Sequence, residues 1–150
     1  MNPWFDKFSL SFGSFNIPVR LLVVDDHEIV RMGVRILLSD NDRWEICGEA
    51  QDGVEAIQKV LDLTPDVVIL DLTMPNLGGF DTALRIRRAS PATKIIFFSI
   101  HETPTTARLV GADAFVSKSA AAGELAQTIT RVMAGGGMNR TAMRYPDWTD

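Results

Sequence analysis

The sequence predicts an α/β fold in which helices cover both faces of a doubly wound, five-stranded parallel sheet. Three observations support this prediction. Short aliphatic runs recur from residue 20 onward, amphipathic helical patterns separate them, and turn or capping residues mark most of the boundaries. Strands that alternate with helices in this way favour right-handed crossovers and a parallel sheet.

The aliphatic runs are predicted to be buried strands because they are short and rich in β-branched residues. Runs such as LLVV and VVIL do not alternate with polar residues, as is typical of parallel strands covered on both faces. The predicted strands are residues 20–24, 44–50, 66–70, 94–100 and 114–116.

Four helical patterns carry apolar stripes at spacings of three or four residues, and we expect each stripe to face the core. Asp52-Gly53 precedes the second pattern, and Ser90-Pro91 ends the third. The stripes are Ile29, Gly33, Ile36 and Leu37 in the first; Val54, Ile57 and Leu61 in the second; Phe80, Ala83 and Leu84 in the third; and Leu125, Ile129, Val132 and Met133 in the last.

The composition is that of one globular domain and excludes two classes of partner. The chain has 150 residues, is 46% hydrophobic and carries a formal net charge of -4, which gives no support for direct DNA binding. No run approaches the roughly 20 apolar residues that span a bilayer, so no membrane association is expected. The single cysteine, Cys47, fits a reducing, cytoplasmic location.

Both terminal segments lie outside the strand and helix pattern. Residues 1–19 form an aromatic-rich arm with one tryptophan and four phenylalanines, and they lack the features of a signal peptide. This arm is either a loosely ordered extension or a segment that docks on the domain's own surface or on a partner. Residues 137–150 form a polar tail, and we expect no output domain in the chain beyond the domain of residues 20–136.

Polar residues follow the predicted strands at their carboxyl ends. Asp25 and Asp26 follow the first strand, Asp71 follows the third, Ser99 lies in the fourth, and Lys118 follows the fifth. An aspartate after a strand is commonly a turn or capping residue. In a doubly wound sheet, however, all these ends meet at one edge, where ligands bind.

The chemistry of this set of side chains is restricted. Three carboxylates suit a hard divalent cation, and Mg²⁺ takes a few carboxylates while it keeps bound waters. If one carboxylate attacks a phosphorus atom, the cation, a lysine and a hydroxyl can stabilise the transferring oxygens. Asp71 is the predicted nucleophile because it follows a central strand, and Pro75 and Gly78-Gly79 can keep the space above it open.

Four motifs carry a family resemblance. VVDDHEIVRMGVRILL, EAQDGVEAI, PDVVILDLTMPNLGGFD and GADAFVSK, in this order, resemble the receiver domain of two-component response regulators. The resemblance covers residues 20–136, and it is greatest to the branch with LuxR-type helix-turn-helix output domains. It implies a flavodoxin-like sheet with strand order 2-1-3-4-5.

The resemblance also implies roles for the acidic residues. Asp71 corresponds to the phosphoacceptor. Asp26, Asp71 and the main-chain carbonyl of Thr73 correspond to direct Mg²⁺ ligands, and Asp25 binds the cation directly or through water.

The remaining motif positions correspond to the parts of a phosphorylation switch. Lys118 and Ser99 correspond to the groups that bind the phosphoryl oxygens, and Ser99 and Phe115 to a switch pair. The added phosphoryl charge can draw the serine inward, and the aromatic ring then fills the vacated space. Thr73 and His101 match two positions that tune dephosphorylation.

The sequence departs from the family pattern after Ser99. The segment IHETPTTARLV is about one helical turn shorter than is usual, and Pro104 restricts where a helix can begin. We therefore expect a shortened fourth helix, over about residues 105–110. The face that this helix helps to form often carries output or dimer contacts in the family.

The preferred function is a phosphoacceptor signalling module that receives a phosphoryl group on Asp71 from a sensor histidine kinase or a phosphotransfer protein. Such a module phosphorylates and dephosphorylates itself but is no enzyme for an external substrate, and it is either a stand-alone receiver or part of a LuxR-type regulator. A homodimer is one expected assembly. One alternative is a degenerate receiver that acts as an interaction or dimerisation module, and the shortened fourth helix favours it. Another is a Mg²⁺-dependent phosphatase, which is disfavoured because the chain has little sequence to form a cap domain or a substrate pocket.

Overall fold

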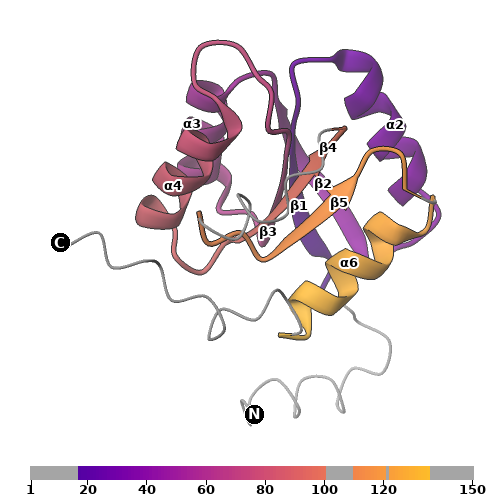
Figure 1. The fold of residues 1–150 in the computed structure, drawn as a ribbon. Helices are drawn as coiled ribbons and strands as arrows, with labels where there is room; N and C mark the ends of the chain where they lie inside the picture. The colour runs from indigo at the N-terminus through magenta and orange to yellow at the C-terminus, as the bar shows by residue number, and fades with distance from the viewer. Residues whose placement is uncertain (1–16, 101–109, 121, 136–150) are drawn as a thin grey trace, which may run out of the picture.

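Five strands form one parallel sheet, and helices lie against both of its faces (Figure 1). The structure is a computed structural model that describes residues 17–100, 110–120 and 122–135. In chain order, the elements are β1 (Val19–Val24), α2 (Glu28–Leu38), β2 (Trp44–Ala50), α3 (Gly53–Leu63), β3 (Val67–Leu70), α4 (Gly79–Ala89), β4 (Lys94–Ser99), β5 (Ala114–Ser117) and α6 (Glu124–Met133).

The strand order is β2-β1-β3-β4-β5, and each neighbouring pair is parallel. This result confirms the predicted flavodoxin-like sheet of order 2-1-3-4-5. The chain moves outward from β1 to β2 and then returns to the other side of β1 for β3. The carboxyl ends of β1 and β3 therefore flank the point where the strand order reverses, which is where ligands bind in sheets of this kind.

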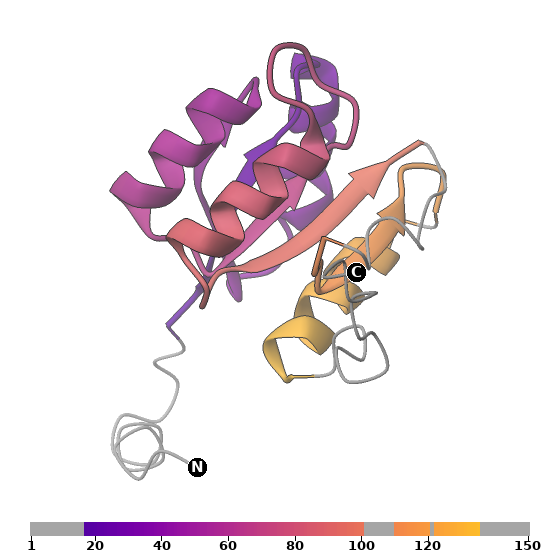
Figure 2. The same ribbon diagram turned by 60° about the vertical axis from the view of Figure 1, so that its left-hand side comes forward.

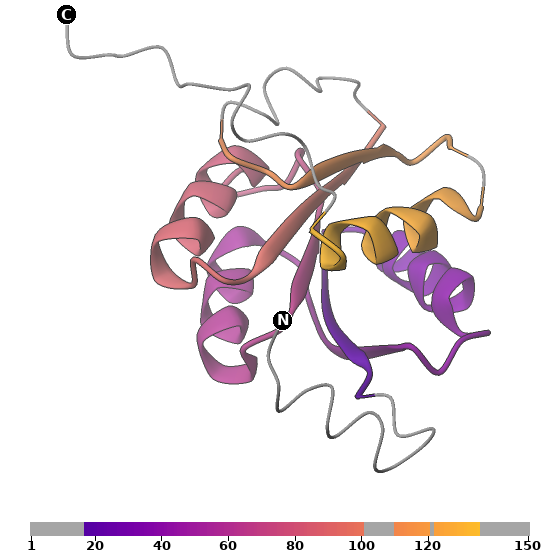
Figure 3. The ribbon, with the colours of Figure 1, turned by 90° about the horizontal axis from the view of Figure 1, so that it is seen from below.

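Each face of the sheet has its own hydrophobic core. Helices α3 and α4 lie side by side on one face (Figure 2), and α2 and α6 cover the other (Figure 3). Successive strand residues alternate between the cores, so that Leu22 and Val24 face α3 and α4 whereas Leu21 and Val23 face α2 and α6. All four side chains are at most 1% exposed. Burying one such side chain contributes about 1.5–3 kcal/mol.

The predicted core face of α2 is wrong. Val34 and Leu38 are buried against the sheet, whereas Ile29 is 73% exposed and Ile36 is 65% exposed. This helix carries apolar residues on opposite sides, and the periodicity alone does not determine which side packs inward.

The core faces of the other helices are predicted with mixed success. In α3, the buried residues are Ala56 and Val60. Of the three residues predicted to face the core, Val54 and Leu61 are exposed and Ile57 is partly buried. The remaining helices follow the prediction except at their flanks. Ala83, Leu125, Ile129 and Val132 are buried, Phe80 is partly buried, and Leu84 and Met133 are exposed.

Several predictions concern residues outside the described part of the chain. They are the aromatic arm up to residue 16, the shortened fourth helix except for Val110, His101, and the tail of residues 137–150. Among the helices that the structure describes, none combines the length and the apolar character that a membrane span requires.

Candidate functional site

Two buried aspartates are fixed at the carboxyl edge of the sheet by strand-like hydrogen bonds. The Asp71 N–H donates to the Val24 carbonyl at 2.9 Å, and the Asp25 N–H donates to the Ala50 carbonyl at 3.0 Å. The parallel pairing thus continues one residue beyond β1 and β3. Asp25 is 2% exposed and Asp71 is 4% exposed, so both carboxyl groups are held where desolvation matters.

Lys118 connects these two acids. Its Nζ donates to Asp25 Oδ2 at 2.6 Å and lies 3.4 Å from Asp71 Oδ1. Its main-chain N–H donates to the Ser99 carbonyl at 2.9 Å, which fixes the lysine at the end of β5 beside β4. The side chain of Lys118 is only 13% exposed, so its charge acts on the acids with little screening by solvent.

Burial raises the pKa of Asp71 above its ordinary value, since desolvation penalises the charged carboxylate. The ammonium of Lys118 opposes this effect, the negative charge of Asp25 adds to it, and the Thr73 N–H lowers the pKa by a hydrogen bond. Desolvation is the largest of these influences. Asp71 is therefore a carboxylate whose charge the protein compensates only in part.

Asp26 completes an acidic cluster that is short of positive charge. Its Oδ1 atom is buried and has no hydrogen-bond partner among the described residues, although His27 Nδ1 lies 3.1 Å away. Ligand atoms of Asp25, Asp26 and His27 lie within 4.8 Å of one another, close enough to hold a metal ion. The predicted Mg²⁺ ligand Asp71 is not a member of this group. A buried carboxylate oxygen that accepts no hydrogen bond from the described residues, at an edge rich in acids, fits a hard cation such as Mg²⁺.

The loop from Asp71 to α4 depends on one glycine. The Gly79 N–H donates to the Leu72 carbonyl at 3.0 Å, and a Cβ at residue 79 would collide with the main chain of Asp71 and Leu72. Glycine therefore lets α4 start directly against the end of β3. Thr73, two residues after Asp71, is exposed at the mouth of the site.

The predicted switch residues lie on the β4–β5 side of the sheet. Ser99 is fully buried at the end of β4, and Phe115 is half-buried on β5, packed against the core that α3 and α4 cover. Phe115 pairs with Phe97, two residues before Ser99, so the serine and the ring lie on the same face. His101, the other predicted tuning residue, is outside the described residues.

Arg31 is a supporting residue that the sequence did not reveal. Its Nη1 donates to the Asp25 carbonyl at 2.6 Å, and its Nε donates to Glu49 Oε1 at 3.2 Å. The arginine thereby ties the acidic loop to β2. No local pattern marks it, because an arginine on an amphipathic helix is most often a solvated residue.

Comparisons with known proteins agree with the motifs. The family model of the response regulator receiver domain matches residues 21–130. Response regulator GacA of Pseudomonas viridiflava is 38% identical over 120 residues, which are 78% of this chain and 56% of that protein. Response regulator UvrY of Escherichia coli is 37% identical over 120 residues, or 78% of this chain and 55% of that protein. The chain thus spans about half the length of the curated relatives it matches.

Solved structures show the same likeness. A LuxR-family two-component response regulator from an Aurantimonas species superposes with a TM-score of 0.77 and 35% identity, covering 81% of this chain and 89% of that one. The response regulator domain of Thermotoga maritima CheB gives a TM-score of 0.73 and 31% identity, covering 79% and 98%. The first of these belongs to the branch that the sequence motifs resemble.

Proposed function

This chain belongs to the response regulator receiver domain family, and from that premise we propose that Asp71 accepts a phosphoryl group from a sensor histidine kinase or a phosphotransfer protein. One observation carries the proposal. A buried carboxylate at the end of a central strand lies 3.4 Å from a lysine ammonium that also contacts a second buried acid. By the same premise, residues 20–136 form the receiver, and it acts in the cytoplasm.

The transfer needs one nucleophile and charge compensation. A carboxylate oxygen of Asp71 forms a bond to phosphorus while the bond from phosphorus to the donor's imidazole nitrogen breaks, and that nitrogen keeps the electron pair. Lys118 is held where its ammonium can stabilise the transferring oxygens. Attack requires the charged carboxylate, and the lysine favours that form against the desolvation that raises the pKa.

Asp25, Asp26, Asp71 and the Thr73 carbonyl are the groups that would hold Mg²⁺. When bound, the cation supplies the positive charge that three carboxylates and one lysine lack, and it neutralises phosphoryl oxygens. The Oδ1 atom of Asp26, which is buried and accepts no hydrogen bond from the described residues, supports this assignment.

The switch rests on Ser99 and Phe115. After phosphorylation, the Ser99 hydroxyl binds a phosphoryl oxygen, and the half-buried ring of Phe115 turns into the space beside it. Exposed Thr73, together with His101, sets the rate at which water removes the phosphoryl group. The module hydrolyses its own phosphoaspartate and acts on no external substrate.

Phosphorylation of the full chain tests the proposal. The protein is incubated with Mg²⁺ and acetyl phosphate, and its intact mass is compared with that of Asp71→Asn and of Asp81→Asn, a control at an exposed position of α4. We expect a Mg²⁺-dependent phosphoryl adduct in the wild type and the control, and none in Asp71→Asn.

Other outcomes would select the alternatives. No adduct with acetyl phosphate or beryllofluoride, together with no Mg²⁺ binding, would indicate a degenerate receiver that serves as an interaction or dimerisation module. Steady release of phosphate from an added phosphomonoester would indicate a phosphatase.

A further inference from the structure

Asp25 is held through both its backbone and its carboxylate. Its N–H donates to the Ala50 carbonyl at 3.0 Å, and its Oδ1 accepts a hydrogen bond from the His27 N–H at 2.9 Å. Its Oδ2 accepts a hydrogen bond from Lys118 Nζ, and its main-chain carbonyl accepts one from Arg31 Nη1 at 2.6 Å. The lysine therefore acts on the carboxylate of Asp25, whereas the arginine acts on its backbone.

The hydrogen bond from Arg31 also bears on the next residue, Asp26. The peptide group that joins Asp25 to Asp26 is planar, so the direction of the Asp25 carbonyl sets the direction in which the chain continues to the Cα of Asp26. The Oδ1 atom of Asp26 is buried and accepts no hydrogen bond from the described residues. Fixing this peptide therefore helps to fix a carboxylate that has an oxygen left for a ligand.

Arg31 is itself held in place by Glu49 on β2. Its Nε donates to Glu49 Oε1 at 3.2 Å, and its side chain is only 16% exposed. Glu49 pairs with Val23 of β1 and directly precedes Ala50, whose carbonyl holds the Asp25 N–H. Strand β2 thus holds Asp25 twice, once by its own backbone and once through the arginine. A guanidinium can make both contacts because its N–H donors point in fixed and different directions.

We propose that Arg31 is a positioning residue for a divalent cation at the acidic edge of the sheet. Held by Glu49, its guanidinium fixes the peptide between Asp25 and Asp26 and so keeps the Asp26 carboxylate where it can bind the cation. The arginine acts through the backbone and is not a ligand. This inference rests on the proposed function, because it concerns the Mg²⁺ site assigned there.

Charge and positioning predict opposite results when this arginine is replaced. Arg31 places a positive charge beside the acidic edge, and that charge repels a cation that binds there. If charge alone mattered, its removal would strengthen Mg²⁺ binding. Loss of a residue that orients metal ligands instead weakens metal binding, typically by roughly 10- to 100-fold.

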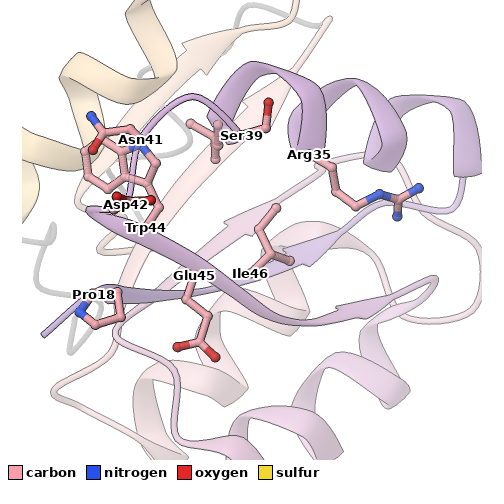
Figure 4. A pocket seen from close by; sticks show the side chains of 9 residues that line it. Pro18, Arg35, Ser39, Asn41, Asp42, Trp44, Glu45 and Ile46 are labelled. Carbon is pink, nitrogen blue, oxygen red and sulfur yellow. The ribbon is translucent and has the colours of Figure 1, made fainter.

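Arg35 provides a matched control one turn further along α2. Its guanidinium also pairs with Glu49, at the other carboxylate oxygen. Figure 4 shows Arg35 among the side chains that line a pocket of about 440 Å³ near the end of α2 and the start of β2. Within the described part of the chain, Arg35 makes no hydrogen bond to the loop of residues 25–27. Replacing either arginine leaves Glu49 paired with the other, so we expect both variants to fold.

Mg²⁺ titrations of the full chain test the proposal. Proton–nitrogen correlation spectra report the fold and the Mg²⁺ dissociation constant of the wild type, Arg31→Gln, Arg31→Lys and Arg35→Gln. Arg31→Gln should raise the dissociation constant about tenfold, and Arg35→Gln should leave it unchanged. Arg31→Lys should raise it as well, because one ammonium cannot hold Glu49 and the Asp25 carbonyl in the same geometry.

The outcomes separate this proposal from the function on which it rests. If Arg31 only stabilised the fold, Arg31→Gln would lower the free energy of unfolding while the folded protein kept its Mg²⁺ affinity, and the proposal would be overturned. A rise of equal size in Arg35→Gln, or wild-type affinity in Arg31→Lys, would also overturn it. In each of these cases the wild type still binds Mg²⁺ and the proposed function stands. No Mg²⁺ binding by the wild type would contradict the proposed function, and this inference with it.

Discussion

Asp25 and Asp113 are buried aspartates at opposite ends of the sheet, and each contacts a positively charged side chain that is distant in the sequence. At the amino end, Asp113 Oδ2 accepts hydrogen bonds from Arg87 Nη2 and the Ile95 N–H, both at 2.8 Å. At the carboxyl end, Asp25 Oδ2 accepts a hydrogen bond from Lys118 Nζ at 2.6 Å.

The two ends differ in how completely charge is compensated. Arg87 and Asp113 form a pair of one cation and one anion, and the guanidinium also donates to the carbonyls of Thr93 and Gly111 at 3.0 and 2.8 Å. At the other end, the ammonium of Lys118 faces the carboxylates of both Asp25 and Asp71. Each end holds one buried atom without a hydrogen bond among the described residues, Arg87 Nε and Asp26 Oδ1, so the ends differ in the balance of charge and not in hydrogen bonding. We infer that the first pair stabilises the fold and that the second cluster is built to receive another charge.

The largest expected change in stability comes from replacing Asp113, at the amino end of the sheet. Asp113→Asn should lower the free energy of unfolding by about 3 kcal/mol, because it leaves the largely buried Arg87 without its counter-charge. Urea denaturation of the variant and the wild type measures the change. If the urea concentration at the midpoint of unfolding is the same for both proteins, the pair of Arg87 and Asp113 does not stabilise the fold as inferred.

Mg²⁺ should act only at the carboxyl end. At a hundred times its dissociation constant, Mg²⁺ should raise the free energy of unfolding by about 2.7 kcal/mol. Asp113→Asn should gain as much as the wild type, whereas Asp26→Asn should gain less at the same concentration. Thermal melts with and without a chelator measure these gains. Equal gains in all three proteins would place the cation elsewhere.

Replacing Asp71 should have a smaller effect than Asp113→Asn, and it should stabilise the fold instead of destabilising it. Without Mg²⁺, Asp71→Asn should raise the free energy of unfolding at pH 7 by about 1 kcal/mol, since a neutral amide of the same volume replaces a charge that is only partly compensated. Urea denaturation beside Asp113→Asn gives the comparison directly. If Asp71→Asn and Asp113→Asn both lower the free energy of unfolding, the contact between Lys118 and Asp71 stabilises the fold just as that between Arg87 and Asp113 does.

The pH dependence follows from the raised pKa of Asp71. The folded state disfavours the charged carboxylate, so this group lowers stability above its folded pKa and has no effect below its unfolded pKa. The advantage of Asp71→Asn over the wild type should therefore shrink as pH falls through the folded pKa toward the ordinary aspartate value. A constant difference from pH 7 downward would contradict this assignment.

The sequence predicted the strands and their acidic ends well because both signals are local. Apolar runs that stop at Asp25 and Asp71 mark strand ends, and the rule that parallel strands align their carboxyl ends brings these residues together with Lys118. The rotation of α2 about its axis could not be predicted in this way. Apolar residues occupy two sides of that helix, and only contact with the sheet selects Val34 over Ile36 as the buried residue.

By itself, the sequence determined the element order, the family and the residue types available at the edge of the sheet, since strand burial and motif order are written along the chain. Only the tertiary structure decided how charges are shared. Arg87 meets Asp113 and Arg31 meets Asp25 because packing brings together residues that no sequence period relates. Within the described part of the chain, tertiary packing likewise left Asp26 Oδ1 without a hydrogen bond and Ile29 and Ile36 of α2 exposed, because burial depends on which surfaces meet.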